Sequence, residues 1–77
     1  MGKIASWTNE ELVKGVEHII KEHNLGVRHF DGKTYALFTW GYGKPYAERQ
    51  AVRIRRLGYK ARLTKLRGSM AIWVARK

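Results

Sequence analysis

The sequence predicts an α+β domain in which two helices cover one face of a four-stranded, antiparallel-rich sheet. Three observations predict this fold class. An amphipathic helical pattern opens the chain, two short β-branched and aromatic segments follow it, and the same order of one helix and two strands then recurs. With 77 residues, the chain has room for a single domain, 1–77, with one core. It contains no cysteine, which excludes disulfides and thiolate metal sites.

The first helix is expected to begin at Thr8, a residue type that caps helix N-termini. Glu11 lies three residues on and completes the pattern of a capping box. We expect Asn24 and Gly26 to end the helix. One stripe at helical spacing predicts the side that packs on the sheet, and its members are Leu12, Val16, Ile19, Ile20 and His23.

Two features of this helix predict a close neighbour. Trp7 precedes the cap and Leu12 occupies the fourth helical position, which is the pairing of a hydrophobic staple. Gly15 lies in mid-helix, where glycine costs about 1 kcal/mol relative to alanine. We therefore expect another group to pack closely against the helix at this glycine.

Two short strands are expected next, over residues 27–30 and 33–40. Both segments are rich in β-branched and aromatic residues. The dipeptide Asp31-Gly32 between them is typical of a hairpin turn. A glycine-containing loop, 41–44, then leads to Pro45, and proline suits the first turn of a helix.

The second helix is predicted to run from residue 45 or 46 to residue 57, with Gly58 as its stop. Its narrow apolar side consists of Ala47, Ala51 and Ile54. A stripe of three arginines shares another face, and a fourth arginine flanks it. The stripe is Arg49, Arg53 and Arg56, and the flanking residue is Arg55.

A second hairpin is predicted from residues 59–66 and 70–76. Alternation in the last strand turns Met70, Ile72 and Val74 toward the core and Ala71, Trp73 and Ala75 outward. In the strand before it, Lys60, Arg62 and Thr64 are then expected to face outward. Leu66 does not fit this alternation, so we expect a β-bulge near Lys65.

Charge is divided unevenly along the chain. Residues 1–32 carry four Lys or Arg and five acids, whereas residues 33–77 carry twelve Lys or Arg and one acid, Glu48. The second segment therefore has a net charge of +11 within a chain of net charge +10. Self-repulsion of this size destabilises a compact state unless a polyanion neutralises it. The pattern indicates a surface that meets phosphates, from nucleic acid or an anionic membrane.

Aromatic residues are interleaved with this basic segment, which is typical of proteins that bind unpaired bases. Strand alternation places Trp73 beside Lys60 and Arg62, and we expect its ring to be accessible between small neighbours. Of the other aromatics, Trp40, Tyr42 and Tyr59, some must form core. The candidate nucleic-acid-binding residues are Lys44, Arg49, Arg53, Arg55, Arg56, Lys60, Arg62, Lys65, Arg67, Trp73 and Tyr42.

The loop that precedes the second helix is a further candidate for phosphate contact. Helix N-termini attract anions through free backbone N–H groups, and Lys44 adds charge there. A structural turn is the alternative, because the nucleotide-binding P-loop pattern is absent. The three histidines lack metal-site spacing and no catalytic motif is present, so we expect no cofactor, no metal and no enzymatic activity.

Residues 35–76 resemble one strand-helix-hairpin half of a SPOR-type repeat. The matching features are a strand ending in Trp40-Gly41, the helical pair Ala47 and Ala51, and the segment 56–62 before a closing hairpin. The resemblance implies an α+β sheet. SPOR domains bind peptidoglycan and usually follow a membrane anchor, and we do not carry that function over.

Taken as a whole, the pattern favours a small non-catalytic nucleic-acid-binding protein. RNA or a ribonucleoprotein, such as the ribosome, is favoured. The alternatives are a DNA-binding architectural or regulatory protein and a protein-interaction or dimerisation module. No signal peptide, membrane span or basic amphipathic helix is evident, so we expect a cytoplasmic protein. The scarcity of asparagine and glutamine, together with the lack of cysteine, points to a thermophilic source.

Overall fold

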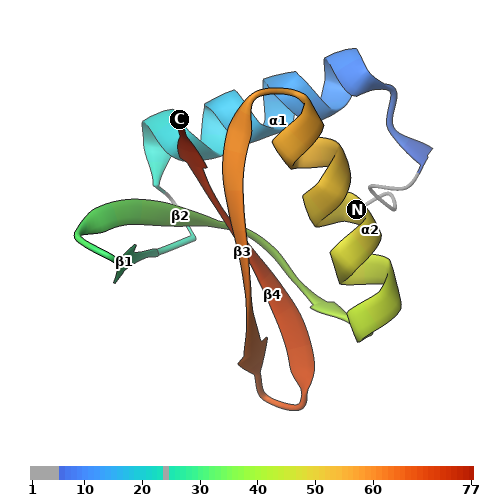
Figure 1. Ribbon diagram of the computed structural model, residues 1–77, viewed down its shortest axis with the longest axis vertical. Coiled ribbons are helices and arrows are strands. Elements are labelled where there is room, and N and C mark those ends of the chain that lie inside the picture. Colours follow the sequence, from blue (N-terminus) through green and yellow to red (C-terminus); the bar gives the residue numbers. More distant parts are fainter. Residues whose placement is uncertain (1–5, 24) are drawn as a thin grey trace.

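The computed structural model describes residues 6–23 and 25–77, and it has the predicted α+β architecture (Figure 1). Two helices lie on one side of a four-stranded sheet whose neighbouring strands are all antiparallel. The strand order across the sheet is β1-β2-β4-β3. In chain order the elements are α1 (Asn9–Glu22), β1 (Val27–Phe30), β2 (Lys33–Tyr42), α2 (Lys44–Arg56), β3 (Tyr59–Leu66) and β4 (Ser69–Arg76).

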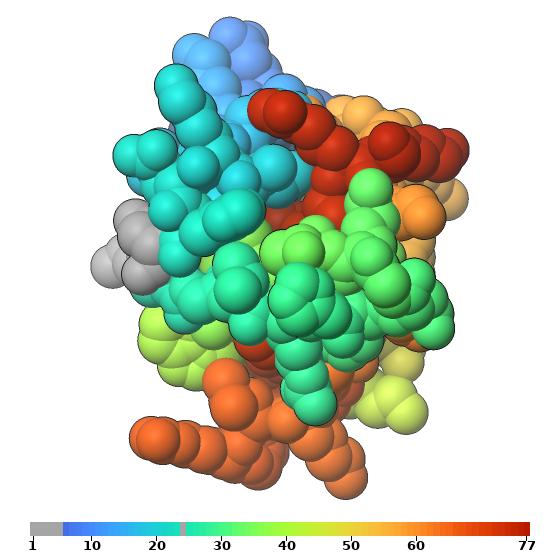
Figure 2. Space-filling model, turned by 90° about the vertical axis from the view of Figure 1, so that its left-hand side faces the viewer, coloured from blue at the N-terminus to red at the C-terminus, as the bar shows by residue number. Residues whose placement is uncertain are grey.

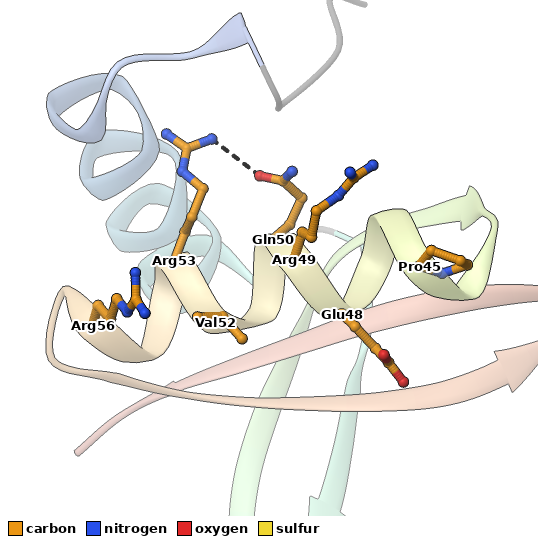
Figure 3. Close-up of a pocket in the computed structure, with 7 residues that line it drawn as sticks. All are labelled: Pro45, Glu48, Arg49, Gln50, Val52, Arg53 and Arg56. Carbon is orange, nitrogen blue, oxygen red and sulfur yellow. Dashed lines mark hydrogen bonds between the residues drawn. The ribbon is translucent and has the colours of Figure 1, made fainter.

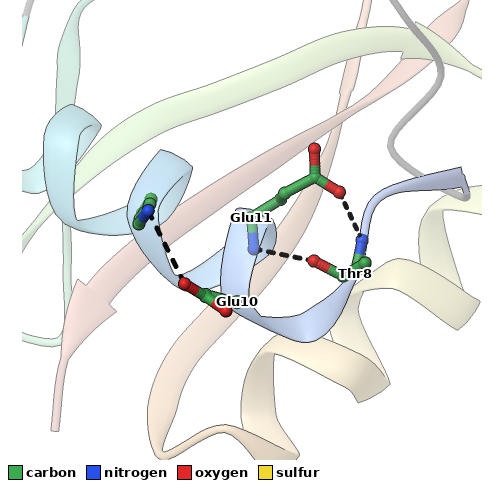
Figure 4. A network of polar contacts seen from close by, with 4 residues as sticks. Thr8, Glu10 and Glu11 are labelled. Carbon is green, nitrogen blue, oxygen red and sulfur yellow. Dashed lines mark hydrogen bonds and ion pairs between the residues drawn. The ribbon is translucent and has the colours of Figure 1, made fainter.

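The N-terminus of α1 carries the predicted capping box (Figure 4). The backbone N–H of Glu11 donates to Thr8 Oγ1 at 3.2 Å, and the backbone N–H of Thr8 donates to Glu11 Oε1 at 2.9 Å. The helix ends at His23, which adopts a left-handed conformation with φ 54°. His23 is exposed, so its predicted place in the buried stripe is wrong. Asn24, expected to help end the helix, lies outside the described residues.

The close neighbour expected at Gly15 is the ring of Trp7. A Cβ built on Gly15 would lie 2.7 Å from Trp7 Cζ3 and 3.4 Å from Phe38 Cε1. The Trp7 and Phe38 rings meet edge to face with centroids 6.2 Å apart. Glycine is therefore required at this position because its backbone lets Trp7 lie directly on the helix.

Both hairpins close with two-residue turns. Asp31 and Gly32 have φ values of 51° and 77°, and Arg67 and Gly68 have φ values of 52° and 80°. Two successive positive φ angles are the signature of a type I′ turn, whose twist matches that of the flanking strands. The second turn is one residue shorter than predicted, because Ser69 already belongs to β4.

The irregularities of the sheet lie in β2. Its pairing with β4 shifts register between Leu37 and Thr39 and again between Trp40 and Tyr42. The pairing of β3 with β4 is regular from Tyr59 to Leu66. The bulge predicted near Lys65 is therefore wrong. Leu66 keeps the alternation of β3 and faces outward, where it packs on apolar residues.

The main core fills the space between the helices and the sheet. Its largest fully buried side chains are Leu12, Val16, Ile54, Ile72 and Val74. Met70 and Tyr59 pack against this core, so the inward alternation predicted for both strands of the second hairpin is confirmed. Within the described residues, no helix is long and apolar enough to cross a membrane.

Candidate nucleic-acid interface

The sheet face turned away from the helices, here called the outer face, carries a second and smaller apolar cluster. Its buried members are Tyr35, Leu37, Ala71, Trp73 and Ala75, and Phe30 and Leu66 pack against them. The outward alternation predicted for Trp73 is confirmed. Its predicted accessibility is wrong, because Trp73 is only 8% exposed and its indole N–H donates to Thr64 Oγ1 at 2.8 Å.

Trp73 is buried because the tip of the β1–β2 hairpin packs over the outer face. Phe30, at the end of β1, meets the Trp73 ring edge to face with centroids 6.1 Å apart. The guanidinium of Arg62, from β3, lies over the Phe30 ring at 4.9 Å from its centroid. Arg62 Nη1 also donates to Asp31 Oδ2 in the hairpin turn at 2.9 Å. Figure 2 shows the hairpin lying across this side of the molecule.

The accessible tryptophan of the basic segment is Trp40. It is 46% exposed and pairs with Ala71, which places it at the uncovered end of the outer face. A shallow depression forms there, and Leu66 and Arg67 from the β3–β4 hairpin line it beside Trp40. Leu25, 42% exposed, completes its apolar side. The sequence-based list of site residues omitted Trp40, although its position just before a glycine at the end of a strand marked it as a rim residue.

Arg67 combines an unfavourable backbone with an exposed charge. Its φ of 52° lies in the left-handed region, which glycine, asparagine and aspartate tolerate best. Its side chain has no ion-pair or hydrogen-bond partner among the described residues. An arginine at a turn position that suits asparagine better is consistent with a role for its charge.

The cations of the outer face are those that strand alternation and pairing put beside the apolar cluster. They are Arg28, Lys33, Lys60, Arg62 and Arg67. Asp31 is the acid that accompanies them, and it already pairs with Arg62. The list made from the sequence missed Arg28 and Lys33, whose membership depends on how the first hairpin folds over the sheet. Within the described part of the chain, every buried side-chain nitrogen or oxygen atom has a hydrogen-bond partner.

The arginine stripe of α2 is divided by the structure (Figure 3). Arg53 is half-buried and ties α2 to the start of α1, because Nη2 donates to the Trp7 carbonyl at 2.8 Å and to Asn9 Oδ1 at 3.3 Å. Its Nη1 donates to Gln50 Oε1 at 3.0 Å. Arg49 and Arg56 remain exposed along a shallow groove on the helix.

The other predicted site residues are dispersed. Lys44 is the first residue of α2, and its Nζ lies 4.0 Å from Glu48 Oε1. Arg55, near the end of α2, donates a hydrogen bond to the Ala61 carbonyl. Lys65 is exposed and, by alternation, belongs to the helix side of β3. Tyr42 is half-buried against the main core, stacked on Tyr46 with centroids 4.5 Å apart. The N-cap of α2 is Gly43, so no side chain caps the first turn of this helix. Phosphate contact by the loop before α2 stays a prediction.

A polar cluster on the helix side joins α1 to the ends of the second hairpin. Arg76 and the Tyr59 hydroxyl both donate to the carboxylate of Glu17. The hydrogen bond from Arg76 is the main cause that lowers the pKa of Glu17, followed by the one from Tyr59. The same contact with Glu17 raises the pKa of Tyr59. Arg76 and Tyr59 therefore link α1 to the second hairpin through Glu17.

In the described ranges, no three His, Asp or Glu side chains gather in a way that could hold a metal ion. Comparison of the chain with protein-family models, with curated proteins and with solved structures gave no match. The resemblance of residues 35–76 to half of a SPOR-type repeat stays a prediction.

Proposed function

We propose that this protein is a cytoplasmic, non-catalytic nucleic-acid-binding protein that binds RNA through its outer sheet face. The single observation that carries the proposal is the exposed ring of Trp40 at the end of a face on which the described residues place Arg28, Lys33, Lys60, Arg62 and Arg67, with Asp31 as the accompanying acid. A structured RNA or a ribonucleoprotein such as the ribosome is the favoured partner. The proposal keeps the basic segment as the binding region and moves its aromatic contact from Trp73 to Trp40.

Electrostatics supports a polyanion as partner. Lys60, Arg67 and Lys33 have no anionic partner among the described residues, so their charges are available to phosphates. Neutralising such cations with phosphates releases counterions from the nucleic acid, which is favourable at low salt. The same step relieves the self-repulsion of the segment 33–77, whose net charge is +11.

The accessible aromatic supports unpaired RNA over duplex DNA. A nucleobase that is free of its pairing partner can stack on an indole ring, whereas a base inside a duplex cannot. Leu66 and Arg67 line the same depression as Trp40, and they supply an apolar side chain and a cation. Together they offer one base a flat surface and its phosphate a charge.

Salt dependence of binding tests the polyanion part of the proposal. If about five phosphates are neutralised, log K for single-stranded RNA falls against log salt with a slope of roughly −3.5. Fluorescence anisotropy of a labelled oligonucleotide between low and moderate salt measures this slope. A slope near zero, or no binding at low salt, contradicts the proposal.

Two pairs of variants test where binding occurs. Removing Lys60 and Arg67 (Lys60→Ala with Arg67→Ala) should weaken RNA binding far more than removing Lys14 and Lys21 from α1. Both pairs remove two positive charges, so a difference between them reports location rather than total charge. Equal losses would contradict a localised face.

Replacing Trp40 tests the base contact. Trp40→Ala should weaken binding of single-stranded RNA by about 1–3 kcal/mol and leave duplex binding nearly unchanged. Val27→Ala is the matched control, because Val27 is 47% exposed and its pairing with the core residue Ala36 puts it on the helix side of the sheet, not on the outer face. If single-stranded and duplex binding fall together, stacking is not the role of Trp40.

DNA binding through α2 is the second candidate. Arg49 and Arg56 favour it, because both are exposed on the same groove of one helix (Figure 3). The use of Arg53 within the fold weakens it, since only part of the stripe is left to meet a duplex. Arg49→Ala with Arg56→Ala should abolish duplex binding if this candidate is correct and change single-stranded RNA binding little if it is not.

Self-association is a third candidate, favoured by the exposed apolar pair Trp40 and Leu25. A dimer that buries this pair would persist at high salt, where phosphate binding is weak. Light scattering at high salt distinguishes the two cases. A monomer at high protein concentration excludes the dimer, and a Trp40-dependent dimer contradicts the base contact.

A further inference from the structure

A charged depression lies where the tip of the β1–β2 hairpin meets β3 and the end of α2. Four cations line it: Arg55 from α2, Lys60 and Arg62 from β3, and Lys77, which follows β4. Asp31 is the acid on its lining. The net charge of the lining is therefore +3.

Two of these cations are held in fixed positions before any ligand arrives. Arg55 donates to the Ala61 carbonyl through Nη2 at 2.8 Å and Nε at 3.3 Å. Because a carbonyl is neutral, Arg55 keeps its full charge. Arg62 is held by Asp31 and by its contact with the Phe30 ring. A guanidinium that is already ordered loses little conformational entropy when it binds an anion.

A hydroxyl group opens into the same depression. The ring of Tyr35 is buried in the outer cluster, and its residue also lines the depression. The Tyr35 hydroxyl has no hydrogen-bond partner among the described residues. Every side-chain nitrogen or oxygen that is buried in the described part of the chain does have a partner, so this hydroxyl is not among the buried atoms. The hydroxyl must therefore reach solvent, where it can donate to a bound oxygen.

We propose that this depression is a binding site for a phosphate group that carries two negative charges. A planar guanidinium matches the spacing of two phosphate oxygens, and Arg55 and Arg62 supply two such groups. Lys60 adds a point charge and Tyr35 a neutral donor. A net charge of +3 suits a phosphomonoester better than an internal phosphodiester, which carries one charge.

Such a monoester has two sources, the terminal phosphate of a nucleic-acid strand and free inorganic phosphate. The first source rests on the proposed RNA-binding function, and the second does not. Three ligands therefore distinguish them: one RNA oligonucleotide with a 5′-phosphate, the same oligonucleotide with a 5′-hydroxyl, and inorganic phosphate alone. The affinities come from anisotropy, and the phosphate titration is followed by amide shifts in the NMR spectrum of the labelled full chain.

The 5′-phosphorylated strand should bind about tenfold more tightly than the 5′-hydroxyl strand, a difference of about 1.4 kcal/mol. Lys60→Ala and Tyr35→Phe should each reduce this ratio, whereas Lys14→Ala on α1 should not. Tyr35→Phe removes only an unpartnered hydroxyl, so the domain should remain folded. Inorganic phosphate should shift the amides of residues 60–62.

Equal affinity of the two strands, with no shift caused by inorganic phosphate, overturns the site while RNA binding stands. A ratio that neither variant changes also overturns it, because the preference then arises elsewhere. If inorganic phosphate shifts residues 60–62 but neither strand binds, the site stands and the proposed function fails.

Discussion

Replacing Arg67 by asparagine should make the domain more stable and a weaker binder. Arg67 holds a left-handed backbone with φ 52° in the β3–β4 turn. This conformation costs an ordinary residue about 1–2 kcal/mol, and asparagine before Gly68 is the preferred type I′ sequence. We expect Arg67→Asn to raise the free energy of unfolding by about 0.5–1 kcal/mol. For a domain of this size, that change raises Tm by about 2–8 °C.

The same substitution removes one cation from the outer face. Loss of one phosphate contact should make the salt slope for single-stranded RNA shallower by about 0.7, which corresponds to about fivefold weaker binding at 0.1 M salt. Thermal denaturation followed by circular dichroism measures the first effect, and anisotropy across a salt series measures the second. Arg67→Lys is the matched control, because it keeps both the charge and the backbone cost. A lower Tm for Arg67→Asn refutes the strain argument, and unchanged binding refutes the place of Arg67 in the interface.

Three further variants test the packing. Trp73→Ala should cost about 3–5 kcal/mol of stability, measured by urea unfolding, because Trp73 is buried; a loss below about 1 kcal/mol would contradict its place in the outer cluster. Gly15→Ala, which normally stabilises a helix by about 1 kcal/mol, should destabilise this one because its Cβ would lie 2.7 Å from Trp7, and a Trp7→Leu background should restore the gain. Glu17→Gln should lower stability at neutral pH only. Arg76 lowers the pKa of Glu17, so the advantage of the natural residue is full above its ordinary pKa of 4.5 and is lost as pH falls through the lowered value. Equal differences between the two proteins at pH 7 and pH 3 would contradict this linkage.

The local elements of the fold were predictable because their signals are local. Thr8 and Glu11 lie three residues apart, and the capping box they predict needs no tertiary contact. The turn at Asp31-Gly32 follows in the same way from residues that accept positive φ. Strand alternation also assigned the correct face to Trp73. These inferences hold because neighbouring residues alone determine the backbone conformation.

The errors arise where a distant segment covers a surface. Alternation gives the face of Trp73, but its burial depends on Phe30, which arrives from the other hairpin. Leu66 suggested a bulge because an apolar residue had no expected partner on the outer face, and the second apolar cluster provides one. A helical projection cannot show that Arg53 reaches the Trp7 carbonyl. The sequence therefore locates a basic segment, whereas the surface on which its side chains lie follows only from the tertiary structure.

The most direct test of the proposed interface is an amide chemical-shift map of the ¹⁵N-labelled protein with a single-stranded RNA oligonucleotide. The largest shifts should fall in β2 and β4 and in residues 60–67, and the indole N–H signal of Trp40 should move with them. Signals from α1 should change little. Shifts confined to α2, or no shifts at low salt, would contradict RNA binding through the outer face.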